Sequence, residues 1–474
     1  MLNVISSDTA INDSLRSTTP DTVPVKQPVK RKDHYALYVF FILFAATLLN
    51  GLDASEFTGA STVIARELHL GINDIGILAS AFTIFLTISI IPVGIWADRA
   101  KRSHVIAACL AIWSLATALT GLAGSFIALF FTRMFTGIGE AGYAPAGYSL
   151  VGDFFEDNQR GKVISGLSVA SLLGPILGMV LGGVIAGLGT GSWKLAFLVT
   201  GIPGLILAFF AWRLREPARR QSGTLTNDAR TMASSALKPA EIVADLGKLL
   251  RIKTLVCLTV IGVLTAFTST ALSSYFPILL QQHDTFGMTS AQAAIYAGLA
   301  LGPTALIAIM LGGYLTDWLN RRYQSARLLV SVVSILLTAP LNMTALFIML
   351  NTHNIILFSA VMVPAFFINM MHIGPLTAAM LDVVPAEMRA SAIAIFVFIQ
   401  RILGTALAPL VIGTLASSFD PGGLHFLHSL AGHDLTLALL ITCPVAYIGA
   451  GIAGIAGLRW VGHDRTAAEG ELAA

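Results

Sequence analysis

The chain has 474 residues, of which 55% are apolar and 12% charged, and its formal net charge is +3. Because a soluble domain carries about 25% charged residues, this composition excludes most soluble folds and intrinsic disorder, and it indicates a chain that lies in the lipid bilayer. The three cysteines all fall within apolar runs, which excludes a disulfide scaffold. The small, scattered charge excludes a nucleic-acid-binding face.

Apolar segments long enough to cross a membrane recur along the chain. A spanning helix needs about 20 apolar residues, and the sequence predicts twelve such helices. They cover residues 36–60, 75–97, 104–122, 126–151, 162–187, 194–212, 254–281, 290–318, 326–350, 355–381, 390–415 and 435–458. We therefore expect an all-α membrane protein with twelve transmembrane helices.

Polar segments divide these helices into two groups of six. Residues 1–34 form a polar leader that lacks the apolar stretch and cleavage site of a signal peptide, and we expect a disordered cytoplasmic segment there. Residues 214–253 are rich in Arg, Lys, Ser and Thr, which is typical of a cytoplasmic linker. Six-helix bundles are thus predicted at residues 35–213 and 254–458, followed by a cytoplasmic tail at 459–474.

Basic residues give the predicted helices a direction. Loops on the cytoplasmic side of a membrane carry an excess of Lys and Arg. With the amino terminus inside, only four of the 29 basic residues fall elsewhere: Arg66 and Lys194 in outer loops, and Arg133 and Arg401 within helices. We expect a multi-pass protein of the bacterial cytoplasmic membrane with both termini in the cytoplasm.

Two spacings recur in the two predicted bundles. GIWADRAKR at residues 94–102 follows the second helix, and GYLTDWLNR at residues 313–321 follows the eighth, with Gly, Asp and Arg at the same intervals. After the fourth and the tenth helices, an aspartate precedes an arginine by seven residues. An internal repeat at this scale indicates two pseudo-symmetric halves.

The aspartates and arginines of these repeats are predicted to act as gates. An aspartate at a helix end can meet an arginine and the amino terminus of a neighbouring helix, whose dipole favours negative charge. We expect such latches to form when the cytoplasmic side is shut; the alternative is that they are ordinary interfacial charges. The predicted gating residues are Asp98, Arg102, Asp153, Arg160, Asp317, Arg321, Asp382 and Arg389.

These features resemble the major facilitator superfamily, whose members have two six-helix halves around a central substrate site. Residues 94–102 look like its signature loop. Within it, the chain is most similar to the Spinster-like group, in GIGEAGY at 137–143, DFFEDNQR at 153–160, VVPAEMRASA at 383–392 and LGTALAP at 403–409. The resemblance implies a secondary active transporter that works by alternating access on a small-molecule or lipid-like solute.

The resemblance leaves two solute classes open. Spinster-like proteins are implicated in moving lysophospholipids and sphingoid phosphates, whereas sugar-acid and organic-anion symporters share a helix-four pattern that includes Arg133 and Glu140 here. The Spinster-like group commonly has Asp followed by Arg in the first helix, where this chain has Asp53 followed by Ala54. An anionic solute is expected in either case.

Five ionisable side chains lie deep in the predicted helices: Asp53, Glu56, Arg133, Glu140 and Arg401. Each costs about 2.5–3.5 kcal/mol in hydrocarbon, so their presence indicates a function. Helix rise places Asp53 at the level of Arg133, and it places Arg401, in the other half, at the level of Glu140. Arg133 and Glu140 are seven residues apart and share a helix face. Glu56 lies three residues further out on the same helix, and it either belongs to the functional group or faces the outer vestibule.

We hypothesise that Asp53 and Glu140 bind and release protons, with Arg133 as their charged partner. Opposite charge favours an ionised carboxylate and burial favours a neutral one, so alternately pairing and drying the carboxylate would move a proton. Arg401 is predicted to hold an anionic head group through two hydrogen bonds, and Tyr143, three residues from Glu140, to line the same site. The alternative is a static ion-pair network that packs the halves together.

Other classes of protein fit the sequence less well. It has no GxxxxGK[ST] loop, so we expect neither nucleotide-driven transport nor a cofactor. It has no clear metal-ligand cluster and no nucleophile with its base, so we predict neither an enzyme nor a metal site; an intramembrane enzyme is a minor alternative. A channel, usually assembled by symmetry around a pore, is the other alternative. The expected partners are protons, the solute and membrane lipids.

Overall fold

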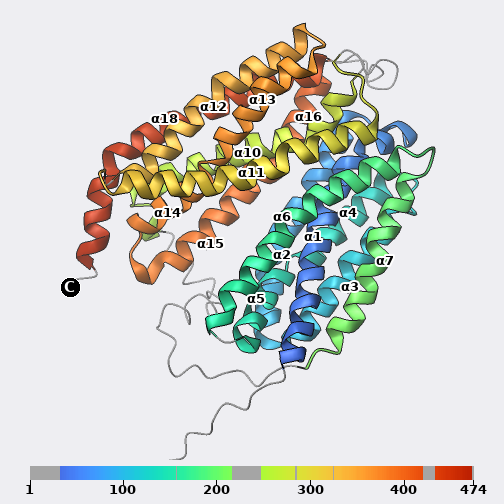
Figure 1. Ribbon diagram of the computed structural model, residues 1–474, viewed down its shortest axis with the longest axis horizontal. Coiled ribbons are helices and arrows are strands. Elements are labelled where there is room, and N and C mark those ends of the chain that lie inside the picture. The colour runs from blue at the N-terminus through green and yellow to red at the C-terminus, as the bar shows by residue number, and fades with distance from the viewer. Residues whose placement is uncertain are drawn as a thin grey trace, which may run out of the picture.

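The structure, a computed structural model, describes residues 33–155, 157–215, 247–282, 285–323, 325–419 and 433–471, and its regular elements there are helices (Figure 1). Eleven segments in this part of the chain are long and apolar enough to cross a membrane. The chain is therefore a multi-span integral membrane protein.

The amino-terminal half contains the first seven helices. It begins at the first described residue, Asp33, and its last helix ends just before the predicted linker. The helices are α1 (Asp33–Glu67), α2 (Ile72–Arg99), α3 (Arg102–Thr120), α4 (Phe126–Glu140), α5 (Tyr143–Phe154), α6 (Asp157–Ala186) and α7 (Trp193–Trp212).

The carboxyl-terminal half follows in the same up-and-down order. Its helices are α10 (Lys253–Gln281), α11 (Ser290–Asn320), α12 (Ala326–Asn351), α13 (Ile355–Met370), α14 (Ile373–Val383), the 3₁₀ turn η1 (Ala386–Met388), α15 (Arg389–Ile399), the π-helix η2 (Gln400–Ala406), α16 (Leu407–Phe419) and α18 (His433–Glu471). The last helix extends into the predicted tail as far as Glu471, and Asp464 there accepts a 2.9 Å hydrogen bond from the Thr254 backbone N–H at the start of α10.

The fourth crossing of each half is broken at the same place. A two-residue turn separates α4 from α5 at Ala141 and Gly142, and another separates α13 from α14. Each second segment carries a proline, Pro145 or Pro375, as its third residue. Proline lacks an N–H and clashes with the turn before it, so a new helix starts there and the proline lies in its first turn.

This break explains the count of eleven long segments. The helices α4 and α5 have 15 and 12 residues, and each is too short to cross alone. Together they form the crossing predicted at residues 126–151, so the expected fold of twelve transmembrane helices in two pseudo-symmetric halves is confirmed. What the sequence missed is that the fourth and tenth helices are discontinuous.

Glycines bring α6 directly against α1. A Cβ atom at Gly178 would lie 2.1 Å from the Leu52 backbone oxygen, and one at Gly182 would lie 2.3 Å from that of Glu56. Only glycine permits this approach, as the four-residue spacing of Gly174, Gly178 and Gly182 predicts. The contact fixes the part of α1 that carries Asp53 and Glu56.

The two halves meet at one end and spread at the other. We call the end where α1 begins the proximal end and the end where α1 finishes, at Glu67, the distal end. Near the distal end, Gln281 Nε2 donates to Thr62 Oγ1 across the halves at 3.1 Å, and Ser290 Oγ lies 3.5 Å from the Gly59 backbone oxygen. The bundles diverge from there towards the ends where α1 starts and α18 finishes (Figure 1). The conformation is closed at its distal end.

Candidate functional site

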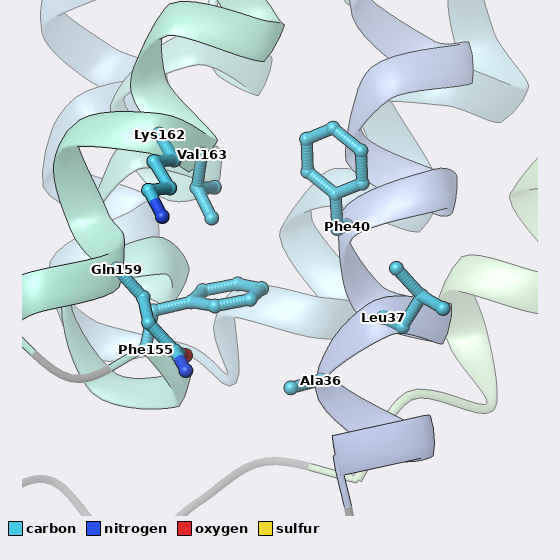
Figure 2. A pocket seen from close by; sticks show the side chains of 7 residues that line it. All are labelled: Ala36, Leu37, Phe40, Phe155, Gln159, Lys162 and Val163. Carbon is cyan, nitrogen blue, oxygen red and sulfur yellow. The ribbon is translucent and has the colours of Figure 1, made fainter.

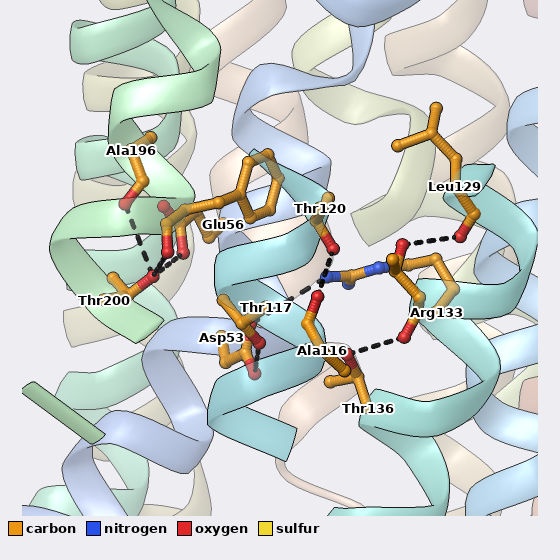
Figure 3. Close-up of polar contacts among 12 residues, drawn as sticks. Asp53, Glu56, Ala116, Thr117, Thr120, Leu129, Arg133, Thr136, Ala196 and Thr200 are labelled. Carbon is orange, nitrogen blue, oxygen red and sulfur yellow. Dashed lines mark hydrogen bonds and ion pairs between the residues drawn. The ribbon is translucent and has the colours of Figure 1, made fainter. Parts of the chain in front are cut away.

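Helices of the amino-terminal half bring ionisable side chains together in its core. Asp53 on α1 and Arg133 on α4 are both buried, and Arg133 Nη2 lies 3.9 Å from Asp53 Oδ1. Asp53 Oδ2 accepts a 2.5 Å hydrogen bond from Thr117 Oγ1 on α3 (Figure 3). The two residues therefore lie at the same depth, as helix rise predicts.

Aromatic rings surround the Arg133 guanidinium. Its Cζ atom lies 5.0 Å from the centroid of Phe57, 6.0 Å from that of Phe82 and 5.7 Å from that of Phe197. These distances allow cation–π attraction. Its Nε and Nη2 atoms have no hydrogen-bond partner among the described residues, and 3.9 Å is too long for a hydrogen bond. Arg133 is therefore held by rings and by charge, without a bidentate clamp on Asp53.

Glu56 is completely buried in this distal-closed conformation. Its Oε2 atom accepts a 2.7 Å hydrogen bond from Thr200 Oγ1 on α7 (Figure 3). Its Oε1 atom has no hydrogen-bond partner in the described part of the chain. The sequence could not reveal this burial, because it depends on α7 packing over the distal part of α1.

An acidic residue at the end of α4 interacts with charged groups of both halves. Glu140 is the last residue of α4 and is only 8% exposed, and it interacts electrostatically with Asp53 and Arg133 of its own half, with the side chain of Asn50 on α1, and with Arg401 of the other half. Arg401 is the second residue of the π-helix η2. Such π-helical turns interrupt α-helices frequently at functional sites. The predicted equal depth of Glu140 and Arg401 agrees with this electrostatic interaction.

Tyr143 lies in the core of the amino-terminal half, where its side chain contacts α1 and α3. Its hydroxyl donates to the Leu43 backbone oxygen at 2.6 Å and lies 2.7 Å from Thr47 Oγ1. Its ring packs edge-on against Trp113. The three-residue spacing argument assumed one continuous helix, whereas a two-residue turn separates Glu140 on α4 from Tyr143 on α5.

At the proximal end of the amino-terminal half, two predicted gating residues form an ion pair. Arg102, the first residue of α3, pairs with Asp153 near the end of α5. Arg160 instead binds the end of α5: its Nε donates to the Phe155 oxygen at 3.1 Å and its Nη2 to the Gly152 oxygen at 2.5 Å. Arginine thus satisfies carbonyl groups that a helix end leaves without partners.

The carboxyl-terminal half repeats this arrangement with one residue that the sequence comparison missed. Arg327, the second residue of α12, pairs with Asp382 near the end of α14. Arg389 Nε donates to the Val384 oxygen at 3.3 Å, as Arg160 does to the equivalent carbonyl. Arg321, predicted as the counterpart of Arg102, is exposed, as is Asp317.

The sequence repeat pointed to Arg321 instead of Arg327 because the two connecting loops differ in length. The connection from α2 to α3 is two residues long, whereas that from α11 to α12 spans residues 321–325. Comparing the repeats without a gap therefore stops at Arg321, six residues short of Arg327. The sequence could have identified Arg327 by its position, because it lies in the first turn of the next helix, as Arg102 does. The side chain of Asp98 lies outside the described residues.

The two proximal ion pairs also differ from the predicted latch. Each joins two helices of one half, Arg102 with Asp153 and Arg327 with Asp382, and both form while the halves are packed together at the distal end. Both pairs are thus present in this distal-closed conformation. They hold the proximal end of each half together as a unit.

A separate cavity lies away from these charges. It has a volume of about 340 Å³ and opens between α1 and α6 at the proximal end (Figure 2). Its walls are mostly apolar, and its polar side chains are Gln159 and Lys162. Because none of the predicted proton-coupling or substrate-binding residues lines it, the charge cluster between the helices is the stronger candidate site.

Comparison with known proteins adds a family to this geometry. Residues 43–409 match the profile of the Major Facilitator Superfamily. The chain is similar to Protein spinster of Drosophila melanogaster, 24% identical over 80% of this chain, and to the Probable L-galactonate transporter of Escherichia coli (strain K12), 27% identical over 59%. The alignments span 61% of each relative's length.

Solved structures show the same fold. A bacterial homolog to the human lysosomal transporter Spinster, in an inward-facing and occupied conformation, superposes with a TM-score of 0.78 at 23% identity. The match covers 92% of this chain and 99% of that one. The likeness therefore extends over both halves.

Proposed function

The chain belongs to the Major Facilitator Superfamily of secondary transporters, and we propose that it moves a small organic or amphipathic anion by alternating access coupled to protons. Its resemblance to the Spinster-like group extends over most of the chain. The packing of the halves at the distal end and their spread at the proximal end match one state of such a cycle.

The observation that carries this proposal is the electrostatic interaction between Glu140 and Arg401 across the two halves. An anionic solute and the Glu140 carboxylate both suit the Arg401 guanidinium, so they compete for it. When the solute takes Arg401, a proton on Glu140 keeps the buried site near neutrality. Solute and proton binding thus become coupled through one arginine.

Asp53 and Arg133 supply a second proton-dependent contact in this proposal. The carboxylate is paired with Arg133 at 3.9 Å in the distal-closed state. A movement of α4 against α1 that separates the charges favours protonation of Asp53, because a buried carboxylate without a counter-charge is costly. Arg401 alone is assigned to solute contact, since Tyr143 lies in the core.

The proximal ion pairs serve as the gate elements. Arg102 with Asp153 and Arg327 with Asp382 keep the helix ends of each half rigid, so the halves rock as bodies about the central site. We assign the proximal end to the cytoplasm of a bacterial cell, since nearly all basic residues belong to that side. Both termini then lie in the cytoplasm.

Two classes of anionic solute carry a group that the Arg401 guanidinium can bind. A sugar acid is favoured by the similarity to a protein named as a probable L-galactonate transporter, and a lysolipid-type phosphate by the similarity to Spinster proteins. Thermal-shift screening of the purified protein against sugar acids, aromatic acids, lysophospholipids and sphingoid phosphates separates them. We expect one class to raise the melting temperature, and Arg401→Ala to abolish the shift.

Proton coupling is tested with the solute that the screen identifies. In proteoliposomes, wild-type protein should acidify or alkalinise the lumen as solute moves, and Glu140→Gln should lower the number of protons moved per solute while solute exchange continues. The matched control is Glu387→Gln, which makes the same change at an exposed residue of η1. Undiminished solute-driven proton flux in Glu140→Gln would refute the coupling role.

A further inference from the structure

Glu56 is a buried acid without a cation of its own. Its side chain is fully buried between α1 and α7, and its described hydrogen bond comes from the neutral hydroxyl of Thr200. The charged groups that act on it are Asp53, which repels its negative charge, and Arg133, which is already paired with Asp53. Where α6 packs against α1 at Glu56, the residue of α6 in contact is Gly182, which has no side chain.

Counting charges in the cluster gives an imbalance. Three carboxyl groups, Asp53, Glu56 and Glu140, face two guanidinium groups, Arg133 and Arg401. If all five were ionised, the buried cluster would carry one net negative charge, which low-dielectric surroundings disfavour. One bound proton makes the cluster neutral.

The contacts indicate which carboxyl group holds that proton. Asp53 has Arg133 at 3.9 Å and the Thr117 hydroxyl, and Glu140 interacts with both Arg133 and Arg401 and with the side chain of Asn50. Each of the three carboxyl groups has one oxygen without a hydrogen-bond partner among the described residues. Glu56 has the Thr200 hydroxyl, and the one cation that acts on it, Arg133, is paired with Asp53. Of the three, Glu56 is the one whose negative charge would be least compensated.

Its position along α1 links this proton to the distal closure. Gly59 and Thr62, which contact the other half, lie one and two turns beyond Glu56, and Asp53 lies one turn before it. Glu56 is therefore the acid of the cluster next to the closed distal end. Figure 3 shows its side chain directed to Thr200 on α7, whereas Asp53 points to Thr117 on α3.

We propose that Glu56 is a further proton-binding site, protonated while the distal end is closed and discharged when that end opens to water. The step breaks the carboxyl O–H bond, transfers the proton to water at the distal side and leaves a carboxylate. Nothing is oxidised or reduced. Resting on the proposed function, this site adds one proton to those that Asp53 and Glu140 carry in each cycle.

Infrared spectroscopy of the full chain in detergent tests the protonation directly, without solute or gradient. At neutral pH, wild-type protein should show the C=O stretching band of a protonated carboxyl group, and Glu56→Gln should lose it. Thr200→Val should keep the band but shift it, because the hydroxyl's hydrogen bond is gone. Glu387→Gln, at an exposed position, should leave the band unchanged.

Two results would overturn the proposal. An absent band in wild-type protein means that Glu56 is ionised, and a band that survives Glu56→Gln belongs to Asp53 or Glu140. If Glu56→Gln fails to yield folded protein, Thr200→Val decides, since an unshifted band then rejects the assignment. In proteoliposomes, Glu56→Gln should also lower the number of protons moved per solute by one; wild-type protein that moves no protons contradicts the proposed function instead.

Discussion

At the scale of single residues, the buried pair of Asp53 and Arg133 is chemically asymmetric. A carboxylate that loses its partner can take up a proton and become neutral, whereas a guanidinium stays charged at any accessible pH. An Arg133 without its carboxylate partner would be a buried charge, which is costly in free energy. The rings of Phe57 and Phe197 beside it reduce this cost but do not remove it. The two members of the pair are therefore not equally replaceable.

We expect Asp53→Asn to destabilise the protein by about 3–5 kcal/mol, because it leaves a buried cation without its counter-charge. Arg133→Gln should cost less, about 1–3 kcal/mol, since Asp53 can then be protonated. Denaturant titration in mixed micelles measures both, and the double variant shows whether the two losses are coupled. Equal losses from the two single variants would contradict this reading of the pair.

At the scale of helices, interruptions decide where the charged groups lie. The π-helix η2 widens the turn that carries Arg401, and the break after α4 leaves Glu140 at a helix end opposite it. The matching break between α13 and α14 occurs in the other half without a charged residue at that position. The two halves thus share a backbone plan but divide the chemistry between them.

The repeated ion pairs give a prediction for helix starts. Replacing Arg327 with Ala should remove the pair with Asp382, which is partly exposed and worth about 1 kcal/mol or less. A change of this size shifts a conformational equilibrium about fivefold, so solute uptake by proteoliposomes should slow measurably. Arg102→Ala should behave in the same way, since it removes the equivalent pair.

Arg321→Ala is the matched control for these variants, because Arg321 is exposed at the end of α11. The Arg321→Ala variant should keep an uptake rate and a melting temperature close to the wild-type values, because a substitution at an exposed site changes the free energy of unfolding by about 0.5 kcal/mol or less. A stronger effect from Arg321→Ala than from Arg327→Ala would indicate that Arg321, as the sequence repeat predicted, is the gating residue.

At the scale of the whole molecule, the distal closure depends on small residues where the halves touch. A Cβ atom at Gly76 on α2 would lie 2.4 Å from the Pro409 backbone oxygen and 2.7 Å from the Tyr275 hydroxyl, both in the other half. That hydroxyl donates to the same oxygen at 2.6 Å. A larger side chain at Gly76 is therefore incompatible with the closed distal end.

Gly76→Leu should favour the distal-open state by about 1–3 kcal/mol, the usual cost of overpacking, and so by about fivefold or more. The measurement is the rate at which a thiol reagent labels Thr62→Cys, since Thr62 is buried in the closure. The three native cysteines would first be replaced by alanine. Gly94→Leu, on the same helix with open space around it, is the control; equal labelling rates would contradict the proposed closure.

Much of the architecture could be predicted because membrane constraints act locally. Bilayer thickness fixes the length of an apolar run, and helix rise then gives the depth of each charged residue. The depths of Asp53 with Arg133 and of Glu140 with Arg401 were predictable in this way. Tyr143 was not, because its direction depends on a helix break after Glu140.

The amino-acid sequence by itself therefore determined the membrane class, the repeated halves and the level of each buried charge, since these follow from hydropathy and a constant rise per residue. Only the tertiary structure decided which side chains pair with one another. Thr200 faces Glu56 because α7 packs over α1, and Arg327 replaces Arg321 because a longer connection carries it to Asp382. Such pairings join residues far apart in the chain, and only helix packing brings them together.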